Sequence, residues 1–443
     1  MTQPHRTLPE TDFDVRVDAW TTAAMHEGAK TFAALLRHLP GVYPTELLSS
    51  VDRLVARGAL DAMSAAAIRQ QSEVKGGRPA EGRSLLPLPH PLDFEWRFTS
   101  ESSRDLLDQA AALTLPGDDL LLFGTPGLAA EALTLPIGRR LTLLAEANSV
   151  TDRLLALNRA TGSPLDIAFC RAGLPRDSAD AVLLDPPWYP DFVRPMLAAA
   201  AHACRLGGTV LISLPPDGAR PSAAVDRQAA IALGARLGLT LQEHRPLTIG
   251  YETPFFERNA LTAIGIATPP QWRRGDLMIF RKTDVPRRPP AASGHTRGWT
   301  ELAIGRMRLF IRTGTGVHDG NRGLIPIVDG DILPTVSRRD PRRRLADVWT
   351  SGNRIFSTDN PQLVLEAAIS CVAEAAGSGN QPRLWGTIRQ REAIERVAAD
   401  LRHLASIEAA EEGGAATNGL ERSLIWKSGS TNYLSMSRAI PSG

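Results

Sequence analysis

The chain has 443 residues, a length that favours two or three domains, each able to bury a core. Hydrophobic residues make up 43% of the chain and charged residues 22%, which fits an ordinary soluble globular protein. The formal net charge of +2 argues neither for nor against nucleic acid as a partner, so only local clusters of charge can indicate one.

The cysteines and histidines exclude two common kinds of stabilising site. Cys170, Cys204 and Cys371 are scattered and odd in number, which argues against a disulfide framework. No histidine clusters with cysteines at ligand spacing, so no metal site is predicted. The chain opens without a charged and then apolar leader, and no apolar run approaches the ~18 residues that span a membrane. We therefore expect a cytoplasmic protein.

Residues 1–74 are predicted to form a helical module. Its first 16 residues are polar and expected to be loosely ordered. The clearest helix begins at Pro44, a favoured first helical position, and is expected to stop at Gly58. Short helices joined by tight turns are typical of helix-turn-helix or winged-helix modules. Because Arg53 and Arg57 are balanced by nearby acidic residues, we expect a structural or oligomerising module first and a DNA reader second.

Residues 75–93 are rich in glycine and proline and are predicted to be a linker. The aromatic segment after it contains Trp96 and leads into a helix capped by Thr99 or Ser100 that runs to about Leu113. Aromatic residues just before a nucleotide-binding core form a substrate or cofactor wall in some proteins and plain packing in others. Trp96 is therefore a candidate substrate residue.

From Asp118 the pattern changes to strands alternating with helices, which is typical of a parallel, doubly wound sheet. The predicted strands are 119–123, 141–146, 165–170, 181–185 and 208–214, with later strands at 239–243, 260–267 and 276–281. The predicted helices are 128–133, 150–160, 192–206 and 223–237.

The ends of the first three strands carry candidate cofactor residues, because open α/β sheets bind ligands beyond the carboxyl ends of their strands. A Phe-Gly-Thr-Pro-Gly loop follows the first strand, and its glycines let the backbone approach a ligand. Glu146 ends the second strand, 22 positions after Gly124, where a carboxylate binds ribose hydroxyls. The third strand ends where such sheets contact an adenine ring. The cofactor candidates are Phe123, Gly124, Thr125, Gly127, Glu146, Cys170 and Arg171.

The fourth strand runs into the catalytic candidates Asp185, Pro186, Pro187, Trp188 and Tyr189. Neither proline has an N–H, so this segment offers acceptors and almost no donors. Such a site suits a substrate with N–H groups. Asp185 can hold an amine so that its lone pair faces an electrophile, while Trp188 or Tyr189 stacks on a planar or cationic body. A strand that simply ends at prolines in a tight turn is the alternative.

Asp-Pro-Pro-aromatic at a strand end resembles the catalytic motif of S-adenosylmethionine-dependent amino-group methyltransferases, and a related motif occurs in the branched-chain polyamine synthases. Residues 94–283 resemble a class I methyltransferase domain. The glycine loop before the motif, together with the N-terminal helical module, is more similar to the polyamine synthases than to the mRNA adenosine methyltransferases. This resemblance implies a Rossmann-like sheet, a cofactor at Gly124 and Glu146, and an amine positioned by Asp185. The glycine loop departs from the family pattern, since it is poor in glycine and lacks an acidic residue.

Beyond the motif, segment 250–259 between two predicted strands supplies further substrate candidates. Its rings and carboxylates could roof a cationic or planar amine, or they could belong to a packed hairpin loop with solvated charges. The candidates are Tyr251, Glu252, Phe255 and Glu257.

The last third of the chain carries no recognised motif. Residues 284–298 are predicted to be a linker, and residues 299–443 a C-terminal α+β domain. The basic run 337–344 is expected to be a solvated loop before a phosphate site. A long amphipathic helix is predicted over 390–411 and a hairpin over 423–436, which together could form a second winged-helix-like piece.

We expect a transferase that methylates an amine nitrogen from S-adenosylmethionine. One alternative is aminopropyl transfer from decarboxylated S-adenosylmethionine, and another is an inactive methyltransferase fold that binds DNA or assembles with other proteins. The expected partner is an amine-bearing substrate, either a nucleobase amino group or a polyamine. A homodimer and nucleic-acid binding stay open, and no membrane contact is expected.

Overall fold

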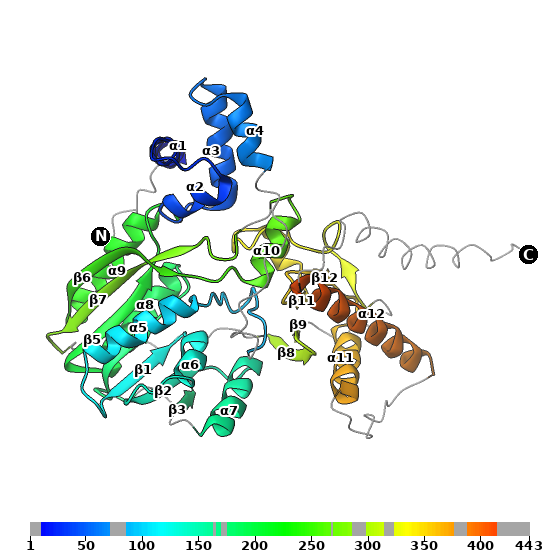
Figure 1. Cartoon of the computed structure of the whole chain (residues 1–443). Helices are drawn as coiled ribbons and strands as arrows, with labels where there is room; N and C mark the ends of the chain where they lie inside the picture. The colour runs from blue at the N-terminus through cyan, green and yellow to red at the C-terminus, as the bar shows by residue number, and fades with distance from the viewer. Residues whose placement is uncertain are drawn as a thin grey trace, which may run out of the picture.

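The computed structural model describes residues 10–70, 86–162, 165–169, 175–266, 269–285, 298–313, 323–375 and 388–413. Figure 1 shows an N-terminal helical module, a central domain of sheet and helices, and a smaller C-terminal part. In these ranges, the structure contains no helix that combines the length and apolar character needed to cross a membrane.

Four helices form the N-terminal module. They are α1 (Glu10–His26), α2 (Phe32–His38), α3 (Pro44–Ala56) and α4 (Ala62–Gln70). The predicted helix from Pro44 is confirmed, and Gly58 follows it at φ +69°. The loosely ordered segment expected up to residue 16 is wrong from Glu10 onward, because α1 begins there. Within residues 10–70 there is no strand, so the described module has no wing.

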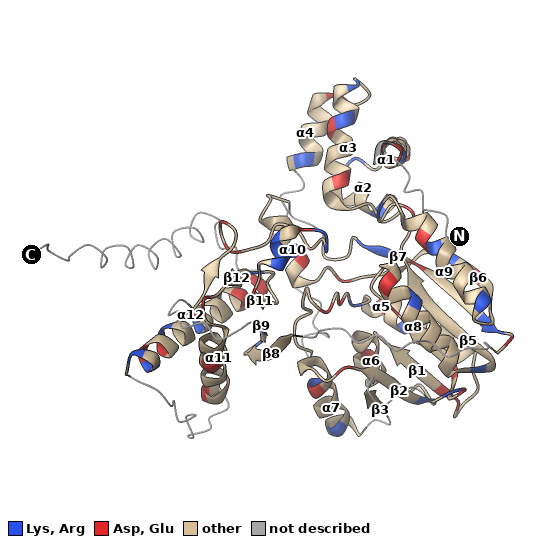
Figure 2. Cartoon of the chain, turned by 180° about the vertical axis from the view of Figure 1, so that it is seen from behind, with Lys and Arg blue, Asp and Glu red and all other residues tan. Residues whose placement is uncertain are grey.

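The arginines of α3 are engaged inside the module. Arg53 Nη2 lies 2.8 Å from Oδ1 of the buried Asp18, and Arg57 binds the same carboxylate. Figure 2 shows both acidic and basic segments on α3. Guanidinium groups paired in this way are poorly placed to contact DNA phosphates, which agrees with the structural role expected for this module.

The predicted Rossmann-like, doubly wound sheet is confirmed. Its seven strands lie in the order β3-β2-β1-β4-β5-β7-β6. The strands β1 to β5 pair in parallel, whereas β7 runs antiparallel to both of its neighbours. The strands are β1 (Asp119–Phe123), β2 (Arg140–Ala145), β3 (Leu165–Phe169), β4 (Ala179–Leu184), β5 (Cys204–Leu214), β6 (Leu239–Gly250) and β7 (Arg274–Lys282).

Helices cover both faces of this sheet because successive strand residues point to opposite sides. Leu120 and Leu122 of β1 join the core beneath one set of helices, while Leu121 joins the core beneath the other. The first set is α5 (Ser100–Ala112), α6 (Pro126–Ala132) and α7 (Ser149–Thr161), and the second is α8 (Pro190–Ala203) and α9 (Ala223–Arg236). The predicted cap is also confirmed, since Thr99 Oγ1 accepts a hydrogen bond from the Ser102 amide at 3.1 Å.

The predicted strand 260–267 is wrong, because the chain forms helix α10 (Phe255–Thr262) there. The loop expected over 250–259 is accordingly shorter, with Gly250 ending β6 and α10 starting at Phe255. Buried residues recur at helical spacing, as Phe255, Phe256, Asn259 and Ala260 show. A short apolar run of this kind does not distinguish strand from helix by its sequence pattern. Likewise, the predicted helix 192–206 ends at Ala203, because β5 begins one residue later.

The predicted C-terminal α+β architecture is confirmed in the described residues. An antiparallel sheet has the order β10-β12-β11-β9-β8 and shares a core with two helices. The helix predicted over 390–411 is the longer of the two, and the predicted hairpin 423–436 lies outside the described residues. The elements are β8 (Trp299–Ile304), β9 (Met307–Arg312), β10 (Ile325–Pro326), β11 (Val348–Thr350), β12 (Ile355–Ser357), α11 (Pro361–Ala375) and α12 (Ile388–Glu412).

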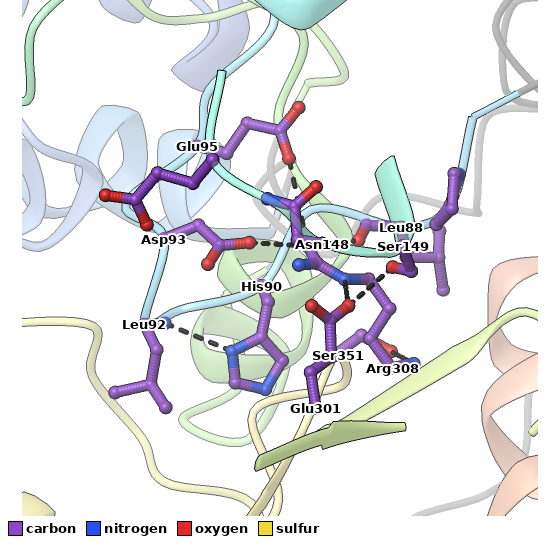
Figure 3. Close-up of polar contacts among 12 residues, drawn as sticks. Leu88, His90, Leu92, Asp93, Glu95, Asn148, Ser149, Glu301, Arg308 and Ser351 are labelled. Atoms are coloured by element: carbon purple, nitrogen blue, oxygen red, sulfur yellow. Dashed lines mark hydrogen bonds and ion pairs between the residues drawn. The ribbon is translucent and has the colours of Figure 1, made fainter. Parts of the chain in front are cut away.

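A buried arginine joins this sheet to the central domain (Figure 3). Arg308 of β9 is fully buried, with Nε 2.7 Å from Glu301 Oε1 and Nη1 2.5 Å from Asp93 Oδ2. Glu301 Oε1 also accepts a hydrogen bond from Ser149 Oγ, at the start of α7, at 2.5 Å. Burial raises the pKa of Asp93 to about 6, and the charge of Arg308 opposes that rise. One guanidinium thus connects β8, α7 and the segment before the central domain.

Replacing this arginine should destabilise the protein strongly. Arg308→Met leaves Asp93 and Glu301 without their shared cation, and breaking a buried ion pair costs about 3–5 kcal/mol. Arg402→Met is the matched control, because Arg402 and its partner Glu374 are both exposed, and a surface pair is worth about 0–1 kcal/mol. Thermal and urea unfolding would measure both. Equal, small effects would show that Arg308 does not connect the two parts.

Candidate active site

The sheet brings the glycine loop and the Asp-Pro-Pro-Trp motif together. Strand β1 lies beside β4, at the point where the strand order reverses and where open α/β sheets bind ligands. The Asp185 amide donates to the Phe123 carbonyl at 3.2 Å. Gly124 adopts φ +69°, and a Cβ there would lie 3.0 Å from the Asp185 carbonyl oxygen. A side chain at residue 124 would therefore separate the loop from the motif.

Asp185 is held by a tyrosine from the end of β6. The Tyr251 hydroxyl donates to Asp185 Oδ1 at 2.6 Å and also shares a hydrogen bond with Ser213 Oγ. Burial raises the pKa of Asp185 to about 7, while the hydrogen bond from Tyr251 and the charge of Arg273 counteract part of that rise. A carboxyl group that titrates near neutral pH can accept a hydrogen bond or a proton from a substrate.

The indole of Trp188 packs against an arginine of the protein itself. Arg273 Cζ lies 4.1 Å from the ring centroid of Trp188 and 4.1 Å from that of Trp96. Tyr251 meets Trp188 edge-on, with ring centroids 5.5 Å apart. Burial lowers the pKa of Arg273, and the neighbouring Tyr251 and Glu257 oppose this change. Trp96, Trp188 and Tyr251 thus surround a guanidinium of the protein itself.

A second buried carboxyl lies on the other side of Arg273. Glu257 is fully buried and accepts a hydrogen bond from Tyr43 of the N-terminal module. Its pKa is raised to about 7 by burial, against the effects of Tyr43 and Arg273. Within the described residues, Glu257 Oε2 has no hydrogen-bond partner, and neither does the buried Trp272 Nε1. Tyr43 contacts the Trp272 ring edge-on at 5.6 Å, so two unsatisfied polar atoms flank one tyrosine.

The cofactor side fits a nucleoside in two of its features. Thr125 in the glycine loop is 4% exposed, and its Oγ1 has no partner in the described part of the chain. Glu146 is exposed just beyond β2, and its carbonyl accepts a hydrogen bond from Thr151 Oγ1 at 2.7 Å. An unsatisfied hydroxyl and an available carboxylate are groups that bind ribose and polar cofactor atoms. Gly127 is different, because Arg97 fills the space of its missing side chain, with Cγ 3.2 Å from a Cβ there.

The other predicted site residues are dispersed. Glu252 accepts a hydrogen bond from Gln271, and Phe255 lies beneath Arg258 in α10. Tyr189 packs against a different group of rings, described below. Cys170 and Arg171 lie outside the described residues. Of the predicted substrate residues, Trp96, Tyr251 and Glu257 are the ones grouped around Arg273.

Several residues of this group were not predicted from the sequence. Ser213, Arg273 and Tyr43 come from the end of β5, the approach to β7 and the N-terminal module. Gly275 belongs with them, because a Cβ there would lie 2.9 Å from Ser213 Oγ and 3.0 Å from the Trp188 ring. The local sequence signal was that two arginines, Arg273 and Arg274, directly follow Trp272. Tyr43 had none, since it lies 214 positions from Glu257.

The expectation of a solvated loop over 337–344 is wrong for Arg343, which is partly buried, whereas Arg338 is exposed as expected. Arg338 Cζ lies 4.8 Å from the centroid of Tyr189, and Arg343 Cζ lies 4.4 Å from that of Trp349. Cation–π packing of this kind holds guanidinium groups against rings. The run thus contacts the residue that follows the Asp-Pro-Pro-Trp motif.

Comparisons with known proteins found likenesses to solved structures. No family model matches the sequence, and no curated protein sequence matches it. A branched-chain polyamine synthase mutein from Thermus thermophilus is 17% identical, with a TM-score of 0.47 over 62% of this chain and 90% of that one. A putative RNA methyltransferase from Pyrococcus horikoshii is 15% identical, with a TM-score of 0.35 over 49% of this chain and 96% of that one.

The hydrogen bond from Tyr251 should control the titration of Asp185. Tyr251→Phe removes a donor that stabilises the ionised carboxylate, so the pKa of Asp185 should rise above its wild-type value of about 7. A hydrogen bond to a charged group is worth about 1.5–3 kcal/mol, which predicts a rise of about one pH unit or more. Carbon-13 NMR of labelled aspartate would measure it. An unchanged titration would show that Tyr251 does not hold Asp185 in solution.

Proposed function

We propose that the protein is an S-adenosylmethionine-dependent transferase that alkylates an amine nitrogen positioned by Asp185. The observation that carries this proposal is the placement of Asp185 at the reversal of strand order, against Gly124, with one carboxylate oxygen bound by Tyr251. Neither Pro186 nor Pro187 has an N–H that could donate to the other oxygen. The Ser213 hydroxyl also lowers the pKa of Asp185 through a side-chain hydrogen bond, so an incoming amine would bind this carboxyl group beside Ser213.

The residues on the cofactor side have complementary roles in this proposal. Glu146 would bind the ribose hydroxyls, and Thr125 Oγ1 would gain the hydrogen-bond partner that it otherwise lacks. When bound, the cofactor supplies an electrophilic carbon on a positively charged sulfur. Asp185 orients the amine nitrogen toward that carbon, and the protein contributes chiefly by placing the two reactants. The N–C bond would form as the C–S bond breaks and the neutral thioether leaves, and the proton of the acidified nitrogen would pass to the Asp185 carboxylate.

The sandwiched arginine favours a neutral, planar acceptor. Arg273 lies between Trp96 and Trp188, where a cationic substrate would otherwise stack. A polyamine would bring further positive charge next to this guanidinium, and like charges at such distances repel. A neutral aromatic amino group adds no charge and needs no prior deprotonation. Methyl transfer to an amino group on a planar ring is thus the favoured reaction.

Aminopropyl transfer to a polyamine remains the second candidate, on one observation. Asp185 and Glu257 place two carboxyl groups that titrate near pH 7 around a single cation. Two ionised carboxylates could bind a polyamine if the Arg273 side chain moved away from the rings of Trp96 and Trp188. An inactive fold that binds DNA or assembles with other proteins is the third reading.

Cofactor binding should depend on Glu146. Glu146→Ala removes the acceptor for two ribose hydroxyls, which should weaken nucleoside binding by about 1–3 kcal/mol, or about 5–150-fold. Asp152→Ala is the matched control, an exposed acid in the first turn of the neighbouring helix. Titration calorimetry with S-adenosylmethionine, its decarboxylated form and S-adenosylhomocysteine would measure the affinities. Absence of heat with all three compounds would refute the proposed transferase function and leave the inactive fold as the remaining candidate.

Asp185 variants should separate the two transfer reactions. Asp185→Ala should stay folded and keep its cofactor affinity, while turnover falls about 100-fold or more because the nucleophile is misplaced. Asp185→Asn keeps an acceptor oxygen, so it should retain some transfer to adenine- or cytosine-bearing acceptors and lose transfer to spermidine. Release of S-adenosylhomocysteine or methylthioadenosine would be measured with each acceptor.

The pH profile is the control for these variants. Since the pKa of Asp185 is raised to about 7, the ionised carboxylate becomes more abundant as the pH rises from 6 to 8, and wild-type turnover should rise with it. Asp185→Asn should lose this dependence. If both variants lowered the melting temperature and left turnover unchanged, Asp185 would only terminate the strand.

A further inference from the structure

We propose that Arg338 and Arg343, with the rings of Phe94, Tyr189 and Phe192, form a binding site for a phosphate-bearing acceptor. The site lies directly after the Asp-Pro-Pro-Trp motif and is built partly by the C-terminal domain. The statement that this ligand is an acceptor rests on the proposed function. The binding test below does not involve the cofactor.

The three rings form one partly exposed group. Phe94 meets Phe192 with centroids 5.4 Å apart and Tyr189 with centroids 6.1 Å apart, both edge-on. All three side chains are between buried and exposed. Phe94 adopts φ +53°, a left-handed conformation that is strained for a bulky residue. Strained backbone conformations of this kind persist only where the surrounding structure fixes them, and they are common at functional sites. At this residue the Phe94 ring packs against Tyr189 and Phe192.

Arg338 covers this group and keeps unused donors. Its Cζ lies 5.4 Å from the centroid of Phe94, 4.8 Å from Tyr189 and 5.1 Å from Phe192. Its Nη1 bonds Asp191 at 2.9 Å. Within the described part of the chain, the hydrogen bond and the ion pair to Asp191 both use Nη1, and the side chain is about one-third exposed. A stacked guanidinium with free in-plane N–H groups matches the geometry of a phosphate oxygen pair.

Arg343 adds a second cation with little compensation. Its Cζ lies 5.6 Å from the Phe94 centroid and 4.4 Å from that of Trp349, and Nη1 bonds the Val336 carbonyl at 3.1 Å. No ion pair to Arg343 is present in the described part of the chain. Burial lowers its pKa to about 10, and Arg338 contributes to that lowering. A partly buried cation without a carboxylate partner favours an anion nearby.

The local charge favours the same ligand. The run 337–344 contains five arginines and one acid, and that acid, Asp340, is held by Arg342. Asp191 is the acid that faces this run from the motif side. Tyr189 lies four positions after Asp185, so the arginines contact the segment that directly follows the motif. Rings beside cations are how proteins hold a base-bearing phosphate chain.

The test uses fluorescence anisotropy with a labelled ten-nucleotide adenine strand, at low and moderate salt, on the full chain. Wild-type protein should bind, with affinity falling as salt rises. Arg338→Gln should weaken binding about 10-fold or more, and Arg343→Lys, which keeps the charge but loses the planar fork, should also weaken it. The matched control is Arg339→Gln in the same exposed run, with an expected effect of about 2-fold.

Competition identifies the source of the phosphate. If adenosine triphosphate or tripolyphosphate displaces the strand, and Arg338→Gln weakens this competition, the ligand is a nucleotide or a bare phosphate chain. If neither compound competes, the ligand is a nucleic-acid strand. No binding at low salt, or equal losses for Arg338→Gln and Arg339→Gln, would overturn the proposal. Because S-adenosylhomocysteine binding is measured separately, loss of the transferase proposal and loss of this one are distinguishable.

Discussion

The structure of the candidate site depends on one partly buried carboxyl group that is held by a tyrosine. Asp185 can sit at the end of β4 because Tyr251 donates to it and because glycines at 124 and 275 leave room for the surrounding backbone and rings. Burying a carboxylate without such a partner would favour its neutral form still more strongly. The hydrogen bonds from Tyr251 and Ser213 and the charge of Arg273 counteract part of the rise that burial causes, so the pKa of Asp185 lies at about 7.

Three separate parts of the chain contribute residues around the motif. The N-terminal module contributes Tyr43, which binds Glu257, and both Glu257 and Asp185 act on the charge of Arg273. The C-terminal part is fixed by Arg308 and its carboxylates, and Arg338 reaches Tyr189. The central sheet alone would supply Asp185 and the glycine loop. In the proposed function, the flanking parts would select the acceptor.

Sequence patterns were enough to predict the sheet and the position of Asp185. Apolar strand segments that end at glycine or proline are local sequence signals. The bounds of β1 and β4 could therefore be predicted to within two residues. Arg273, Tyr43 and Ser213 could not be placed, because their roles arise from contacts between segments far apart in the chain. The apolar sequence of α10 was compatible with both a strand and a helix. The helix packs Leu261 against the N-terminal module, a contact that the local sequence does not reveal. The ring contacts of Arg338 and Arg343 could not be predicted for a similar reason, since Tyr189 and Phe94 are about 150 residues or more away in the chain.

The most direct test is a crystal structure of the full chain with S-adenosylhomocysteine. The proposed function predicts ribose hydroxyls on Glu146 and the thioether sulfur facing the free oxygen of Asp185, with room between them for one amine nitrogen. It also predicts that Tyr251 keeps its hydrogen bond to Asp185. A nucleoside bound elsewhere, or a sulfur turned away from Asp185, would contradict the assignment of this carboxyl group as the acceptor-positioning residue.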